Sequence, residues 1–123
     1  MEPDLQEMVA AARKRVPEIT PGQAASDLSS GKVTFLDVRE SSEWASGRIA
    51  SAMHVPISQV EEAAETALKE LKDEPIVTYC SHGVRSLLAA DSLKRLGFTN
   101  VSSMVGGLVA WQDQGLPVEG SGG

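Results

Sequence analysis

The sequence is poor in cysteine: its 123 residues contain one, Cys80. A single cysteine cannot form a disulfide within the chain, so we expect a reducing compartment, with the cytoplasm as the default location. The sequence also contains only two histidines, and it lacks the paired or clustered ligands of a structural zinc site. We therefore expect neither a bound metal nor a cofactor.

Long apolar runs and an excess of basic residues are also missing. No apolar stretch approaches the roughly 20 residues that span a bilayer, and the acidic start Met-Glu-Pro-Asp does not resemble a signal peptide. Eleven basic residues are outnumbered by 17 acidic ones, which gives a formal net charge of −6. Because nucleic acids and anionic lipids repel an acidic protein, we expect neither a nucleic acid nor a membrane as a partner.

The length and composition indicate one globular domain. Hydrophobic residues make up 41% and charged residues 23% of the chain, as in ordinary globular proteins, and 123 residues are too few for two cores. We place the domain at residues 18–118. A helix predicted over residues 3–16 forms most of an N-terminal extension, residues 1–17, which either docks on the domain or stays mobile. Residues 119–123 are expected to form a flexible tail.

Within the domain, hydrophobic spacing predicts alternating strands and helices. Strands or extended segments are predicted at residues 33–38, 53–56, 76–79 and 101–105. Helices are predicted from a Thr20 N-cap to residue 28, at 41–46, from a Ser58 capping box to residue 71, at 86–96, and after Gly106. Because these crossovers are long enough for parallel pairing, the pattern predicts a three-layer α/β/α domain with a short, mostly parallel central sheet.

Residues 76–86 form the most informative stretch, which is typical of a buried strand, a tight loop and the first turn of a helix. The loop begins with Cys80, so its N–H groups and the helix N-terminus would face the sulfur and favour a thiolate nucleophile. Gly83 permits the tight turn, and Arg85 supplies a permanent cation suited to an oxyanion. The alternative is an ordinary buried thiol, but the register of Gly83, Arg85 and the helix start favours a reactive site.

Three further polar residues are candidates for this site. Asp37 and Arg39 follow a predicted core strand, at the end of the sheet where open α/β domains bind ligands. A structural ion pair is the alternative; we favour it for Asp37 and leave Arg39 open. His54 has the chemistry of an acid or base, although a histidine packed between loops is the more common arrangement.

Five motifs occur in a characteristic order. They are Leu36-Asp37-Val38-Arg39-Glu40; Glu43-Trp44 with Gly47-Arg48-Ile49 and Ala52; His54-Val55-Pro56; Tyr79-Cys80-Ser81-His82-Gly83-Val84-Arg85-Ser86; and Gly106-Gly107 with Trp111. In this order, over residues 19–118, the chain resembles the single-domain rhodanese-like sulfurtransferases. Arg48 departs from the pattern, because many members carry histidine there. The predicted first helix lies outside the resemblance.

The resemblance implies a two-step sulfur transfer. The Cys80 thiolate would attack the outer sulfur of a donor such as thiosulfate and become a persulfide, from which a thiophilic acceptor such as cyanide or a thiol takes the sulfur. The implied substrate-binding residues are Ser81, His82, Gly83, Val84, Arg85 and Ser86, with Arg39 as a further candidate. Within this set, Arg85 would hold the sulfite portion of thiosulfate, and an exposed His82 would tune contact with an acceptor or partner.

Two rival functions use the same residues. Cysteine phosphatases and arsenate reductases of the same fold place five residues between cysteine and arginine, whereas four separate Cys80 from Arg85. The shorter loop makes a cradle that suits a sulfur atom better than a tetrahedral oxyanion. The second rival is a non-enzymatic persulfide carrier or a regulatory protein-binding module. The expected partners are accordingly a small anionic sulfur donor and a sulfur-relay protein.

Overall fold

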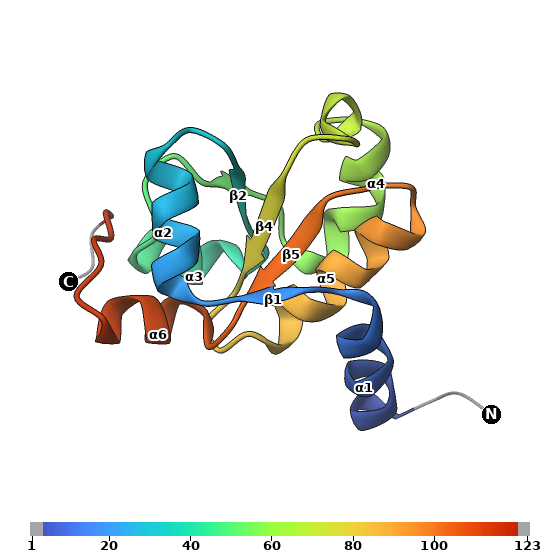
Figure 1. Ribbon diagram of the computed structural model, residues 1–123, viewed down its shortest axis with the longest axis horizontal. Coiled ribbons are helices and arrows are strands. Elements are labelled where there is room, and N and C mark those ends of the chain that lie inside the picture. The colour runs from blue at the N-terminus through green and yellow to red at the C-terminus, as the bar shows by residue number, and fades with distance from the viewer. Residues whose placement is uncertain (1–3, 121–123) are drawn as a thin grey trace.

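The computed structural model describes residues 4–120 and contains one five-stranded parallel sheet within them (Figure 1). The strands lie in the order β1-β5-β4-β2-β3. Their bounds are Glu18–Ile19 for β1, Thr34–Asp37 for β2, Met53–His54 for β3, Ile76–Tyr79 for β4 and Val101–Met104 for β5. Every adjacent pair runs parallel. Strand β4 lies at the centre with all four residues buried, and Cys80 follows it directly.

Helices cover both faces of the sheet (Figure 1). The α-helices are α1 (Leu5–Arg15), α2 (Pro21–Ser29), α3 (Ser41–Ser46), α4 (Val60–Glu65), α5 (Val84–Arg95) and α6 (Gly107–Asp113). One core cluster joins the sheet to α1, α4 and α5, and a second joins it to α2 and α6. Since helices bury their apolar faces on either side of a parallel sheet, the predicted three-layer α/β/α fold is confirmed.

Helix α2 begins at the predicted N-cap, Thr20. The Thr20 hydroxyl accepts a hydrogen bond from the Gln23 N–H at 3.2 Å, and Pro21 occupies the first helical position. The Thr20 N-cap is therefore confirmed. Strand β1, just before it, was not predicted, because two residues are too few to show a periodic pattern; its register with β5 pairs Ile19 with Met104.

The single helix predicted over residues 58–71 is wrong. The segment divides into a 3-10 turn η1 (Ile57–Gln59), α4, and a second turn η2 (Lys69–Leu71), and Ser58 is not a helix cap. Helix α4 ends at Thr66, whose backbone leaves the helical region, although its hydroxyl still donates to the Glu62 carbonyl at 3.0 Å. This break turns Leu68 into the core, where it is fully buried.

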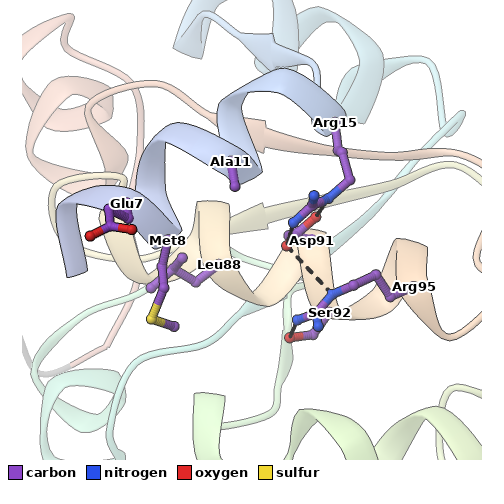
Figure 2. A pocket seen from close by; sticks show the side chains of 8 residues that line it. All are labelled: Glu7, Met8, Ala11, Arg15, Leu88, Asp91, Ser92 and Arg95. Atoms are coloured by element: carbon purple, nitrogen blue, oxygen red, sulfur yellow. Dashed lines mark hydrogen bonds and ion pairs between the residues drawn. The ribbon is translucent and has the colours of Figure 1, made fainter. Parts of the chain in front are cut away.

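Helix α1 docks on α5, which resolves the alternative that the sequence left open. Ala12 is fully buried, and Arg15 makes two hydrogen bonds to the Asp91 carboxylate, at 2.6 and 2.7 Å (Figure 2). Arg95 approaches the same carboxylate from within α5, at 3.5 Å. A cavity of about 420 Å³ lies between the two helices, beside this ion pair. The predicted helix start at residue 3 lies outside the described residues; Asp4 caps the observed helix.

Glu119, the first residue of the predicted tail, is paired in the structure. Glu119 pairs with Arg48 in an antiparallel bridge, with backbone hydrogen bonds of 2.7 and 2.8 Å. These bonds satisfy backbone groups that a mobile tail would leave to water. Residues 121–123 lie outside the described part of the chain. Over residues 4–120, no helix has the length and apolar character needed to cross a membrane.

Candidate active site

The backbone of the loop after β4 is wrapped around the Cys80 sulfur. The Gly83 N–H donates to Sγ at 3.1 Å and the Ser86 N–H at 3.3 Å, while the Cys80 residue is only 2% exposed. Gly83, the residue before α5, has φ of 101°, a left-handed conformation that glycine adopts without a Cβ penalty. Two N–H donors and the N-terminal end of α5 therefore face one sulfur, an arrangement that stabilises negative charge there.

Two buried hydroxyls extend this arrangement. The Ser86 Oγ lies 3.5 Å from Sγ, and it shares a hydrogen bond of 2.9 Å with Ser103 Oγ, on β5. Both serines are fully buried. When Cys80 is ionised, a hydroxyl at Ser86 can donate to the sulfur while Ser103 holds it in place. Sequence reasoning missed Ser103; the one available signal was a serine within a buried strand.

Arg85 is bound by a carboxylate from α3. Glu43 Oε1 and Oε2 accept hydrogen bonds from the two terminal nitrogens of Arg85, at 2.8 and 2.9 Å, and Oε2 accepts another from Ser81 Oγ, at 3.0 Å. These donors, chiefly Arg85, lower the pKa of Glu43 to about 2. Glu43 also raises the pKa of Arg85. Sequence reasoning included Glu43 only as part of a motif, because nothing local shows that it meets Arg85.

Arg39, a candidate substrate-binding residue, is bound through its guanidinium by Asp37. It is 4% exposed, and its guanidinium makes hydrogen bonds of 2.7–3.2 Å to the Asp37 carboxylate. The same group donates to the backbone carbonyls of Glu43, at 3.1 Å, and Gly47, at 2.6 Å. The structural ion pair is thus the observed arrangement, and Arg39 positions α3 rather than a ligand.

His54 lies on β3 and packs against α3, rather than between loops as the common arrangement would have it. Its ring stacks on Trp44 with 4.7 Å between centroids, and its Nε2 lies 2.8 Å from the Arg39 carbonyl oxygen. The Arg48 guanidinium also lies over the Trp44 ring, 4.8 Å from the ring centroid. These contacts hold α3 against the sheet, which fixes the helix that carries Glu43.

The remaining loop residues lie at the surface or against the next loop. His82 and Val84 are exposed, and Ser81 is half-buried. The Cys80 carbonyl accepts a hydrogen bond of 2.8 Å from the Leu108 N–H, at the start of α6. A Cβ at Gly107 would collide with the Cys80 carbonyl oxygen, which explains the glycine at this position.

Comparison with known proteins agrees with this geometry. The model of the rhodanese-like domain family matches residues 20–114. The thiosulfate sulfurtransferase GlpE of Actinobacillus succinogenes is 33% identical over 102 residues, which cover 83% of this chain and 89% of that protein. The senescence-associated protein DIN1 of Raphanus sativus is 31% identical over 121 residues, 91% of this chain and 66% of that protein, so this chain spans about two thirds of DIN1.

A solved structure extends the likeness to the whole chain. A Rhodopseudomonas palustris protein of unknown function, described as a possible tyrosine phosphatase, superposes with a TM-score of 0.88 at 26% identity, over 97% of this chain and 96% of that one. The family match covers most of the chain, and the chain belongs to the rhodanese-like family. Family membership and relatives named as sulfurtransferases support sulfur transfer as its general activity.

Proposed function

We propose that the protein is a sulfurtransferase that carries a sulfane sulfur as a persulfide on Cys80, from a donor such as thiosulfate to cyanide or a thiol. The observation that carries the proposal is the pair of backbone N–H groups, from Gly83 and Ser86, that point at Sγ. Such preorganised donors stabilise a thiolate before the reaction and a persulfide after it. The single cysteine, which has no partner for an internal disulfide, supports a reducing compartment such as the cytoplasm.

The two steps balance in atoms and charge. The Cys80 thiolate attacks the outer sulfur of thiosulfate, a new S–S bond forms, the S–S bond of thiosulfate breaks, and sulfite leaves with two negative charges. Cyanide then attacks the outer sulfur of the Cys80 persulfide anion, and thiocyanate leaves together with the regenerated thiolate. Dividing the transfer in this way replaces one difficult step by two easier ones.

Intact-protein mass tests the proposal directly. Incubation with thiosulfate or cysteine persulfide should add one sulfur, about 32 Da, and cyanide should remove it, as nucleophilic catalysis requires. Cys80→Ser should gain no mass, because a hydroxyl cannot form a persulfide. A wild-type protein that gains no sulfur from any donor, or a Cys80→Ser variant that does gain it, would refute the proposal.

A non-enzymatic carrier is the second candidate, and the exposed apolar side chain of Val84 beside the loop is the observation in its favour. A carrier would load with sulfur but would not turn over. Repeated thiocyanate release per protein molecule, measured with thiosulfate and with cysteine persulfide as the donor and with cyanide in excess, distinguishes an enzyme from a carrier. The phosphatase alternative predicts release of phosphate from an aryl phosphate, which the four-residue spacing between Cys80 and Arg85 disfavours.

A further inference from the structure

The carboxylate of Glu43 occupies the position at which Arg85 would hold an anionic donor. Its two oxygens take both terminal nitrogens of the guanidinium, the paired geometry that a sulfonate group would need. The Ser81 hydroxyl, another candidate ligand of the donor, is turned to Glu43 as well. A small anion that binds Arg85 through this paired geometry must therefore displace a carboxylate that is already bonded to these groups.

Glu43 is held in this position by the protein around it. The Glu40 N–H donates to Glu43 Oε1 at 2.9 Å, and the buried Arg39 donates to the Glu43 carbonyl oxygen at 3.1 Å. Trp44, the next residue, is stacked on His54. A carboxylate fixed by both its side chain and its helix does not swing away at little cost, in contrast to a mobile surface glutamate.

The charged side chains near the sulfur offer no net attraction for a dianion. Arg85 is the only permanent cation in the loop 80–86, and Glu43 neutralises it. The charge of Glu40 also acts on Arg85. The other strand-end cation, Arg39, is neutralised by Asp37. Thiosulfate would bring two negative charges to a site where the fixed charges of the side chains cancel, in a protein whose net charge is −6.

The rim of the loop favours a different kind of donor. Val84, Val105 and Val109 have exposed fractions of 39%, 45% and 40%. Val84 is the first residue of α5, directly after the loop, and Val105 precedes the Gly106-Gly107 turn. Val109 lies at the start of α6, where the Leu108 and Val109 N–H groups bond the carbonyls of Cys80 and Ser81, at 2.8 and 3.1 Å. An organic persulfide carries a carbon group that can contact these valines, whereas thiosulfate presents only sulfonate oxygens.

From these observations we propose that Glu43 is a specificity-determining residue, which disfavours thiosulfate and directs the site to organic persulfides as sulfur donors. The inference rests on the proposed function. In the favoured step, the Cys80 thiolate attacks the terminal sulfur of R–S–SH, a new S–S bond forms between Cys80 Sγ and that sulfur, and the S–S bond of the donor breaks. R–S⁻ leaves with the electron pair, and the proton stays on the transferred sulfur. No oxidant or reductant is needed.

The test compares two donors in three proteins. The second-order rate constant for sulfur loading of Cys80 is measured with thiosulfate and with cysteine persulfide, by quenched intact-protein mass, in the wild type, Glu43→Gln and Glu61→Gln. Glutamine keeps an oxygen that can accept from the Glu40 N–H but removes the charge. Glu61 lies exposed on α4, so its variant removes the same charge elsewhere.

We expect the ratio of the thiosulfate to the persulfide rate constant to rise about tenfold in Glu43→Gln, which corresponds to about 1.4 kcal/mol, and to change less than about twofold in Glu61→Gln. A purely structural ion pair would slow both donors together and leave the ratio unchanged, which would overturn the proposal. An equal rise in Glu61→Gln would assign the effect to overall charge and overturn it too.

A measurement on the wild type alone gives a second readout. If repulsion limits thiosulfate, raising the ionic strength from about 0.01 to 0.2 M should accelerate loading by thiosulfate relative to persulfide, because salt screens exposed charges. Relative loading by thiosulfate that falls with salt would contradict the proposal. Absence of loading by both donors in the wild type would instead refute the proposed function itself, so the two failures are distinguishable.

Discussion

The hydroxyl oxygens of Ser86 and Ser103 lie 2.9 Å apart, and their hydrogen bond joins α5 to β5 beside the Cys80 sulfur. Both side chains are fully buried, so neither has water as an alternative partner. The bond fixes the Ser86 hydroxyl, which lies 3.5 Å from Sγ. Strand β5, the neighbour of β4, thereby contributes a side chain to the surroundings of Cys80, which follows β4.

Substitution of these two serines should distinguish the effect of Ser86, which contacts the sulfur, from that of Ser103, which acts through Ser86. Ser86→Ala should slow loading of Cys80 at least about tenfold, because a hydrogen bond to a charged group contributes about 1.5–3 kcal/mol. Ser103→Ala should slow it only a few-fold, since the Ser86 hydroxyl stays but loses its fixed partner. Both effects should fall on the maximal loading rate rather than on the donor concentration for half-maximal rate.

The matched control for this pair is Ser102→Ala. Ser102 is the next residue on β5 and is half-buried, and its side chain points to the opposite face of the strand. Loading in this variant should equal that of the wild type. If Ser102→Ala and Ser103→Ala slow loading equally, the effect comes from β5 as a whole and not from the hydroxyl pair.

The docked first helix gives a prediction about local stability. Asp91→Asn removes the charge that Arg15 and Arg95 share (Figure 2). The pKa of Asp91 is lowered, mainly by its hydrogen bonds to Arg15, so the ionised form stabilises the docked helix. We expect the amides of α1 to exchange hydrogen at least about tenfold faster in the variant, with β4 unchanged, because this helix can open without global unfolding. Equal acceleration in both elements would show that α1 does not open alone.

Much of the fold could be predicted because most strands and helices are determined by the spacing of apolar residues within each segment. The strand 76–79 and the helix after it are set by buried apolar residues at characteristic spacing, and the structure places β4 and α5 there. The division of the segment 58–71 could not be foreseen, since it depends on Leu68 finding the core. A helical pattern does not show where one side chain must leave the helix to pack.

The site was predictable where it is continuous in sequence and not where it comes from distant segments. Cys80 and Gly83 belong to one loop, so their meeting follows from local geometry. Glu43 reaches Arg85 from 42 residues away, and Ser103 reaches Ser86 from 17 residues away. Arg39 shows the opposite error: a charge at a strand end suggests a ligand, but burial and pairing with Asp37 decide its role.

The crowding at Gly107 predicts a large loss of stability on substitution. Gly107 has φ of 62°, and a Cβ there would collide with backbone atoms of Cys80 and Ser81. Gly107→Ala should lower the free energy of unfolding by more than about 2 kcal/mol, through left-handed strain plus displacement of the loop. Gly97 also has a positive φ, of 99°, but has open space around it, so Gly97→Ala should cost only the strain, about 1 kcal/mol. Equal losses in urea denaturation would contradict the crowding.

The ion pair of Glu43 with Arg85 should appear in the pH dependence of stability. The pKa of Glu43 is lowered from 4.5 to about 2, chiefly by its hydrogen bonds to Arg85. Because the folded-state pKa is depressed, the stabilisation is fully present above the unfolded value and is lost as the pH falls through the folded value. The difference in unfolding free energy between the wild type and Glu43→Gln should therefore be constant above about pH 5 and shrink between pH 4.5 and 2.

Solvent exposure limits the size of this effect. Both side chains are about one-third exposed, so water and salt screen the pair and the stabilisation is smaller than the pKa change alone implies. Urea denaturation at several pH values measures it, and Glu61→Gln is the control, whose difference from the wild type should vary little over the same range. A Glu43→Gln difference that stays constant down to pH 2 would mean that the carboxylate is not stabilised by Arg85 in solution. The charge that we hold responsible for donor choice would then not be fixed beside the loop.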